Sequence, residues 1–315
     1  LDPLVDPAES FVSTGDLPPP GRVASLVDEA HRRFDPVALG QVSNVYPALA
    51  RVPSDLFGIC VVGTDGRVHA VGDAEHEFTI MSVSKPFLFA LICDRIGPTG
   101  ARERLGMNAT GYAFNSAIVA ERSPGGRTNP MVNSGAIAAT SLVPGDDVEG
   151  KWRFIRDGLS RFAGRDLAVN DEVYQSASET NFRNRSLAWM LQGLGGIYSD
   201  PMEAVDLYTR QCSLDVSARD LAVMGATLAD GGFNPLTREQ VVKPDVCHYA
   251  LAAMLTAGMY ETSGDWLYEI GLPGKSGIGG GIVTVSPGKG GLGTFAPLLD
   301  AAGNSVKGQL VAQFL

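Results

Sequence analysis

The spacing of hydrophobic residues changes several times along the chain, and each spacing predicts a kind of element. Apolar residues recur at helical spacing between residues 23 and 34, which predicts a first helix. Two apolar runs, residues 56–63 and 67–71, flank a Thr-Asp-Gly turn and predict a β-hairpin. Strand signals return over residues 274–299, around Pro-Gly and Gly-Gly turns. The two ends of the chain are therefore expected to supply one sheet.

The middle of the chain carries helical patterns separated by loops, and one more helix is expected at the C-terminus. These helices are predicted over residues 187–191, 202–212, 218–229, 248–256 and 305–314. The pattern predicts an α/β fold in three parts: a Pro-rich N-terminal arm (1–20), a sheet subdomain (21–95 plus 266–315) and a mainly helical subdomain (96–265).

Composition narrows the possible partners. With 315 residues, of which 44% are hydrophobic and 19% charged, the chain can bury a large core. A formal net charge of −10 opposes binding to nucleic acid or to anionic membranes, so a small molecule is the expected partner. No apolar run reaches the ~18 residues of a membrane span, and the first residues lack the features of a signal peptide. We therefore expect a cytoplasmic protein.

Ser82 and Lys85 are the strongest candidates for chemistry. The two residues are three positions apart on one helical face, so the lysine amine can take the serine hydroxyl proton without a histidine. The residues that follow, 87–92, are strongly apolar, so Ser82 is expected to open a buried helix near its positive dipole end. The alternative is that Ser82 only caps this helix. Lys275 and Ser276, in a later strand, are expected to lie beside the pair and to add hydrogen-bond donors.

Other motifs point to binding sites that their context does not support. Residues 288–293 match the dinucleotide fingerprint G-x-G-x-x-G, but a strand follows where a helix would have to receive the phosphate. Residues 274–276 end like a phosphate-binding loop, yet the glycines after them start a helix poorly. Four histidines stand singly, so neither a zinc site nor a Ser-His-Asp triad is expected, and we predict no metal and no cofactor. The cysteines are expected to be reduced core thiols: Cys60, Cys93, Cys212 and Cys247.

Four stretches together carry a family resemblance that covers residues 23–301. They are Ser82 to Lys85, Asn129-Pro130-Met131-Val132-Asn133 with the residues after it, Arg183 to Ala188, and Lys275 to Ile282. In order and spacing they resemble the serine-dependent glutaminase family, and the Asn-Pro-Met-Val-Asn motif is specific to it. The resemblance implies a serine β-lactamase/DD-peptidase-like α/β fold, with an antiparallel sheet flanked by helices and a helical subdomain inserted.

The resemblance also implies a role for each matching residue. Ser82 would be the nucleophile and Lys85 its base, while Tyr260, with Tyr46 as a second candidate, would relay a proton to the leaving nitrogen. The backbone N–H groups of Ser82 and Ile278 would form the oxyanion hole. The amino acid end of glutamine would be held by neutral side chains, namely Asn133, Asn184, Tyr208 and Tyr46. Buried neutral donors and acceptors suit a zwitterion that loses its water.

One position departs from the family pattern. The family has a glutamate seven residues before the asparagine that matches Asn184, and this chain has Ala177 there. Glu179 lies two residues further on and would point elsewhere if the segment is helical, although an irregular loop would bring it in. We include Glu179 among the candidate substrate-binding residues, and the partner of the substrate ammonium stays open.

The sequence thus predicts an enzyme that converts L-glutamine to L-glutamate and ammonia, with L-glutamine as its small-molecule partner. We also expect a homo-oligomer, either a dimer or a tetramer. Two alternatives remain at this stage. A penicillin-recognising serine hydrolase would be acylated by a β-lactam, and a non-catalytic domain would bind glutamine without turnover.

Overall fold

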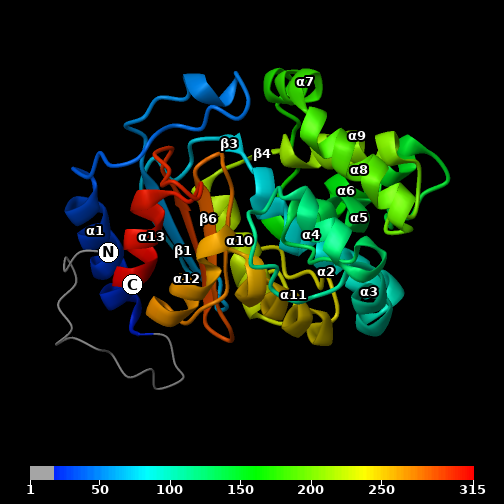
Figure 1. The fold of residues 1–315 in the computed structure, drawn as a ribbon. Helices are drawn as coiled ribbons and strands as arrows, with labels where there is room; N and C mark the ends of the chain where they lie inside the picture. The colour runs from blue at the N-terminus through cyan, green and yellow to red at the C-terminus, as the bar shows by residue number, and fades with distance from the viewer. Residues whose placement is uncertain (1–17) are drawn as a thin grey trace.

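A five-stranded antiparallel sheet forms the centre of the computed structural model, which describes residues 18–315 (Figure 1). The strand order is β2-β1-β7-β6-β5, and a short separate pair joins β3 to β4. The bounds are β1 (Gly58–Gly63), β2 (Val68–Gly72), β3 (Phe78–Thr79), β4 (Asp215–Val216), β5 (Gly274–Ser276), β6 (Gly281–Ser286) and β7 (Gly290–Phe295). Strand β1 pairs with β7, so the prediction that both chain ends supply the sheet is confirmed.

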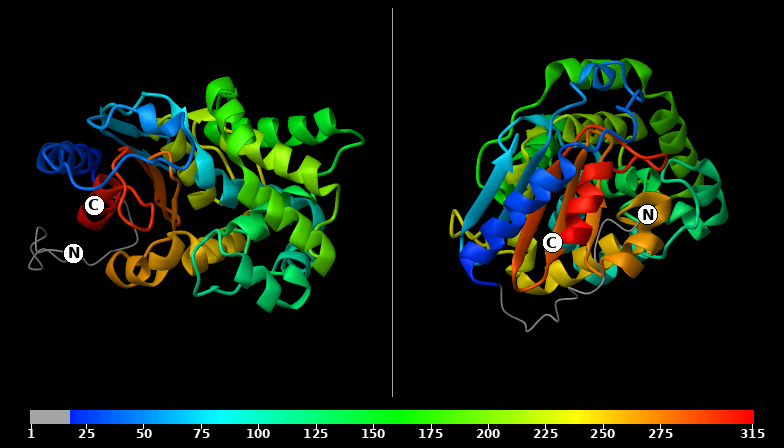
Figure 2. Two further views of the ribbon diagram at one scale, coloured as in Figure 1. Left: turned by 45° about the horizontal axis from the view of Figure 1, so that its top comes forward. Right: turned by 90° about the vertical axis from the view of Figure 1, so that its left-hand side faces the viewer.

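Helices from both ends of the chain cover one face of the sheet. They are α1 (Pro20–Phe34) and α13 (Val306–Phe314), which lie side by side in Figures 1 and 2. The apolar residues that predicted α1 by their helical spacing include its buried face, which consists of Val27, Ala30 and Phe34. Helix α13 begins after Ser305, whose side chain accepts a hydrogen bond from the Gly308 N–H.

The other face of the sheet is covered by α10 (Ala218–Ala229), whose N-terminus is closed by a capping box between Ser217 and Asp220. Glycines on β7 let this helix come close. A Cβ at Gly291 would lie 2.3 Å from the Ala222 carbonyl oxygen, and one at Gly293 would lie 2.0 Å from that of Ala218. Of the glycines that match the dinucleotide fingerprint, Gly293 thus serves helix-on-sheet packing.

The remaining helices, with the exception of α12, lie beyond α10, on the side of the molecule away from α1 and α13 (Figure 2), whereas Trp266 of α12 packs in one cluster with Ala312 of α13. They are α2 (Lys85–Ile96), α3 (Pro98–Leu105), α4 (Ala117–Arg122), α5 (Asn133–Thr140), α6 (Val148–Ala163), α7 (Asp171–Thr180), α8 (Phe182–Leu194), α9 (Pro201–Cys212), α11 (Pro244–Ala257) and α12 (Ser263–Glu269). Short 3₁₀ turns are η2 (Leu49–Arg51), η3 (Met81–Ser84), η4 (Pro124–Gly126) and η5 (Tyr260–Thr262). Within the part of the chain that is described, no helix is long and apolar enough to cross a membrane.

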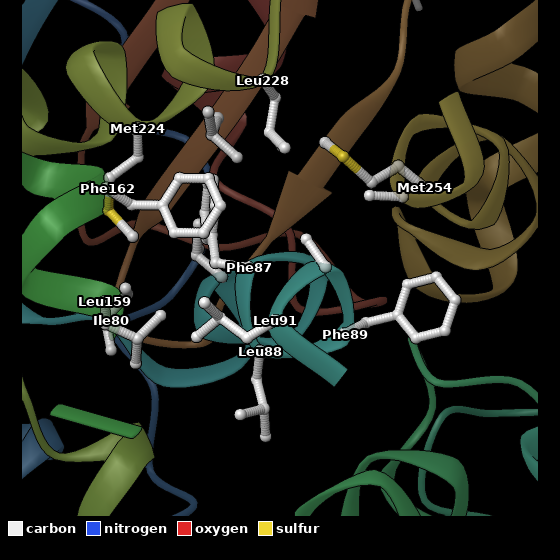
Figure 3. Close-up of a cluster of buried hydrophobic side chains, with 14 of the residues drawn as sticks. Ile80, Phe87, Leu88, Phe89, Leu91, Leu159, Phe162, Met224, Leu228 and Met254 are labelled. Carbon is white, nitrogen blue, oxygen red and sulfur yellow. The ribbon is translucent and has the colours of Figure 1, made fainter. Parts of the chain in front are cut away.

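Helix α2 runs through the main hydrophobic core. All of its residues from Lys85 to Cys93 are buried, as expected for a helix that is apolar on every side. Figure 3 shows side chains of α2 surrounded by residues of three other helices, among them Phe162 of α6, Leu228 of α10 and Met254 of α11. Close packing on all sides fixes the position of α2, and with it the residues at its N-terminus.

The predicted α/β class is confirmed, as are the helices expected in the middle and at the end of the chain. The three-part division stays a prediction. One helix of the 96–265 segment, α10, packs directly on the sheet, so this segment is not a layer apart from it. Most of the expected N-terminal arm, residues 1–17, lies outside the described residues.

Candidate active site

A cavity of ≈ 130 Å³ lies where the turn before α2 meets helices α7, α8 and α9. Most of its lining residues carry a polar group, and nearly all of them are uncharged. The lining residues are Val45, Tyr46, Met81, Ser82, Phe114, Asn115, Asn133, Ala177, Thr180, Asn181, Arg183, Asn184, Tyr208, Thr209, Cys212, Ser213 and Ile278. Six of the predicted site residues are among them, contributed by segments far apart in the sequence: Tyr46, Ser82, Asn133, Asn184, Tyr208 and Ile278. A small polar molecule is the kind of ligand that suits such a pocket.

Ser82 lies in the 3₁₀ turn η3, which continues directly into α2. The sequence predicted that Ser82 opens the helix itself; instead α2 begins at Lys85, with Pro86 in its first turn. In a 3₁₀ turn, residues three apart are eclipsed, so Ser82 and Lys85 still lie on the same side. The preceding residue, Met81, has φ +47°, a left-handed conformation that is costly for a side chain of this size.

Close packing of a later segment fixes the backbone at Ser82. Gly277 follows β5, and a Cβ on it would lie 3.3 Å from the Ser82 nitrogen and 3.0 Å from the Ile80 carbonyl oxygen. A side chain at this position would force its neighbours to shift by a few tenths of an ångström. Within residues 18–315, the N–H groups of Ser82 and Ile278 donate no hydrogen bond to another residue. Two free donors therefore accompany the Ser82 side chain.

Lys85 is buried beneath the pocket, with 2% of its surface exposed. Its Nζ donates to the Asn133 Oδ1 at 2.8 Å and to the Met131 carbonyl oxygen at 3.2 Å. Neither acceptor carries a charge, so no carboxylate offsets the loss of water around an ammonium. Burial accordingly lowers the pKa of Lys85 to about 7. Near neutral pH a large fraction of this amine is unprotonated and can accept a proton.

A chain of side-chain amides continues from Lys85 along the pocket wall. Asn133 Nδ2 donates to the Asn184 Oδ1 at 3.0 Å, and the Tyr208 hydroxyl donates to the Asn133 Oδ1 at 3.4 Å. Asn181 Nδ2 donates to the Thr209 Oγ1 at 2.9 Å. These bonds hold helices α5, α8 and α9 together at the pocket. They also fix the orientation of each amide, because both ends of Asn133 are engaged.

Tyr260 lies behind Ser82, fully buried and also in a left-handed conformation, with φ +55°. Its ring packs against Phe114 and lies 4.6 Å from the Lys275 Nζ. Its hydroxyl makes no hydrogen bond of normal geometry to a described residue, and the Ser276 hydroxyl makes none either. Burial raises the pKa of Tyr260, and the nearby hydroxyls of Ser82 and Ser276 reduce that rise. A buried, neutral phenol therefore stands next to Ser82.

Lys275 and Ser276, both on β5, are 0% exposed and do not line the pocket. Lys275 Nζ donates to two backbone carbonyls, that of Gly258 at 2.8 Å and that of Ser276 at 2.5 Å. Burial, together with the positive charge of Lys85, lowers the pKa of Lys275 well below its ordinary value. This second lysine fastens the Tyr260 segment to the sheet.

Glu179 is the one predicted site residue that the structure does not bring to the site. It is exposed on α7, and its Oε1 accepts a hydrogen bond from the Gln175 side chain at 3.1 Å. The segment is helical, so a residue two positions from the buried Ala177 points away from the pocket. Ala177, by contrast, is 2% exposed and lines the cavity.

Several lining residues were not predicted from the sequence. Arg183 is the first residue of the predicted Arg-Asn-Arg stretch, Asn181 lies two residues before it, and Thr209 lies beside Tyr208, so their neighbours in the chain were the available signal. Cys212 requires a correction. It was expected in the core, but it is only partly buried and lines the pocket, while Cys60, Cys93 and Cys247 are buried as predicted. All four are free thiols.

The fold and this pocket define a globular α/β protein with a serine–lysine pair at a small polar cavity. The glutaminase family model matches residues 40–315, and the chain belongs to this family. Glutaminase 2 of Yersinia pestis is 72% identical over 305 residues, which are 97% of this chain and 90% of the relative. A glutaminase of Brucella canis is 52% identical, covering 85% and 84% of the two chains. A solved structure of the probable glutaminase ybaS is 44% identical, with a TM-score of 0.93 and coverage of 94% and 96%.

Proposed function

We propose that this pocket hydrolyses the side-chain amide of L-glutamine to L-glutamate and ammonia through an acyl-enzyme on Ser82. The observation that carries the proposal is Lys85: a buried lysine with a pKa of about 7, three residues from a serine that lines the pocket. Membership of the glutaminase family supports the substrate.

In the first half of the reaction, the Lys85 amine takes the proton of the Ser82 hydroxyl as Oγ bonds to the amide carbon. The carbon–nitrogen bond then breaks, and the nitrogen leaves as ammonia after receiving a proton through the Tyr260 hydroxyl, with Tyr46 as the second candidate relay. In the second half, water attacks the ester, Lys85 accepts its proton, Ser82 regains one, and glutamate leaves.

The other residues hold the reacting groups in place. The free N–H groups of Ser82 and Ile278 are proposed to stabilise the oxyanion that forms on the amide oxygen. Tyr46, Asn133, Asn184 and Tyr208 are proposed to hold the amino acid end of the substrate. Lys275 and Ser276 are positioning residues that act through Tyr260, which packs against Lys275.

Ammonia release from L-glutamine by the purified chain tests this function, and Ser82→Ala is the matched control. We expect release by the wild-type chain and a glutamyl adduct on the peptide that carries Ser82 when the reaction is stopped with acid. Tight binding of glutamine without ammonia would indicate a binding domain instead. Acylation of Ser82 by a β-lactam, with no ammonia from glutamine, would indicate a penicillin-recognising hydrolase.

We also propose a fold family, a cellular location and an oligomeric state that are consistent with this function. The sheet-and-helix order agrees with a serine β-lactamase-like fold. A cytoplasmic location agrees with a substrate that is a metabolite and with the free cysteines. A homo-oligomer, either a dimer or a tetramer, is proposed as well.

A further inference from the structure

The pocket has an unbalanced charge for a zwitterionic substrate. Of its seventeen lining residues, Arg183 is the one with a permanent charge, and none is an aspartate or a glutamate. L-Glutamine carries both an α-carboxylate and an α-ammonium group. Arg183 offers a partner for the carboxylate, whereas the lining offers no anion for the ammonium.

Titration of lining side chains does not create the missing anion. The ionisable neutral groups on the wall are the phenols of Tyr46 and Tyr208 and the thiol of Cys212. Burial raises the pKa of both tyrosines, and it raises the pKa of Cys212 to about 11. All three stay neutral at physiological pH.

Two amides of the wall, those of Asn133 and Asn184, present a donor rather than an acceptor to the cavity, and the Oδ1 of Asn181, whose Nδ2 donates to Thr209, is an uncharged acceptor. Asn133 Oδ1 already accepts from Lys85 and Tyr208, and Asn184 Oδ1 accepts from Asn133. In this series of hydrogen-bonded side chains, the Nδ2 group of Asn184 is left to bind a ligand. Donors of this kind suit a carboxylate and oppose an ammonium.

The carboxylates on the helices that carry the pocket do not reach it either. On α7, Glu179 binds Gln175 and Glu172 pairs with Arg51. On α9, Asp206 accepts a hydrogen bond from the Tyr174 hydroxyl at 2.5 Å. No acidic residue of these two helices lines the cavity. Ala177 occupies the inward-facing position of α7 and supplies only a methyl group.

We propose that this site takes ω-amides of dicarboxylic acids without selecting for the α-ammonium group, so that the deaminated analogue of glutamine is at least as good a substrate as glutamine. The proposal rests on the proposed hydrolytic function and concerns its substrate class. An ammonium entering this pocket loses its water without gaining an anion, whereas a substrate with hydrogen at this carbon loses nothing.

The test compares kcat/KM for ammonia release from L-glutamine and from glutaric acid monoamide. We expect the wild-type ratio of glutamine to monoamide to be about 1 or lower. Ala177→Glu should raise this ratio on the order of 10- to 150-fold, which is the worth of a charge-assisted hydrogen bond. Ala177→Gln, which adds the same bulk without charge, should change the ratio by less than about 3-fold.

The wild-type measurement decides even if the buried glutamate prevents folding of the variant, which a thermal melt would show. A wild-type preference for glutamine above roughly 10-fold would overturn the proposal. If Glu179→Ala removed that preference, Glu179 would be the partner of the ammonium. Absence of ammonia from both substrates would instead refute the proposed function, so the two failures are distinguishable.

Discussion

Two buried serine–lysine pairs lie close to each other in this molecule, and they differ in what they can reach. Ser82 and Lys85 stand at the start of α2, where the serine lines the pocket. Lys275 and Ser276 are on β5, and neither lines it. Burial lowers the pKa of both lysines. A lowered lysine pKa therefore does not by itself mark a catalytic base; the difference between the two pairs is that the serine of the first lines the pocket.

The hydrogen bonds of the two amines explain the difference further. Lys275 is held by two backbone carbonyls, which cannot move without moving the sheet. Lys85 shares its hydrogen bonds between the Met131 carbonyl and a side-chain amide, Asn133, that is itself part of the pocket wall. These contacts support the proposal that the first pair performs chemistry and the second holds the structure around it.

Removing each hydroxyl should separate the two roles most strongly. Ser82→Ala is expected to lower kcat/KM for glutamine by at least about a thousandfold, because no other hydroxyl or thiol of the pocket wall has a lysine three residues away, and burial raises the pKa of the Cys212 thiol to about 11. Ser276→Ala should cost less than about tenfold and leave the melting temperature unchanged or higher, because it removes a buried hydroxyl without a hydrogen-bond partner. Comparable losses in the two variants would show that the pairs are not distinct.

The lysines should differ in the pH dependence of kcat/KM. With a pKa of about 7, Lys85 gains a proton as the pH falls through 7, so activity should fall on the acid side with a midpoint near that value. Lys85→Arg should be nearly inactive over the whole range, since a guanidinium stays protonated.

Lys275→Met is the matched control for this profile. It removes two hydrogen bonds to buried carbonyls, so the melting temperature should fall. The acid midpoint should nevertheless move by less than about half a pH unit, because Lys275 does not set the pKa of Lys85. An acid midpoint that disappears in Lys275→Met but persists in Lys85→Arg would reverse the assignment.

The sheet and the main helices could be predicted from the sequence because their signals are local. Alternation and turn residues indicated β1 and β2, and helical spacing indicated α1 and α10. The glycines of residues 288–293 could also be interpreted from local sequence. A strand pattern rather than a helix pattern follows them, which argued against a dinucleotide site.

The wall of the pocket could be predicted only through the family resemblance. Its residues come from α7, α8, α9 and the segment that carries Tyr46, which meet through tertiary packing. One such contact is the Ala48 N–H, which donates to the Ser176 Oγ of α7 at 3.2 Å. The left-handed conformation of Met81 has no signal in the sequence, because surrounding structure imposes it. The position of Cys212 was predicted wrongly because cysteines are buried on average, and this average does not distinguish a core position from a pocket wall.

The smallest effect on activity is expected at Gly277. This residue follows Ser276 and packs on the backbone of Ser82, so it connects the two serine–lysine pairs. A methyl group there would lie 3.0 Å from the Ile80 carbonyl oxygen and from the Val83 Cγ2, so the turn that holds Ser82 must shift by a few tenths of an ångström. Gly277→Ala should therefore lower kcat by roughly 3- to 30-fold with little change in KM, because a misplaced nucleophile and oxyanion donor weaken the transition state more than substrate binding.

Gly264→Ala, on α12, is the control for this last variant. A methyl group at Gly264 meets nothing within 4 Å, and alanine favours a helix over glycine by about 0.5–1 kcal/mol. It should leave kcat unchanged and raise the melting temperature slightly. If Gly277→Ala changed stability but not kcat, β5 would support the fold alone. A selective loss of kcat would show instead that β5, which carries Lys275 and Ser276, contributes to the reaction by placing Gly277 against Ser82.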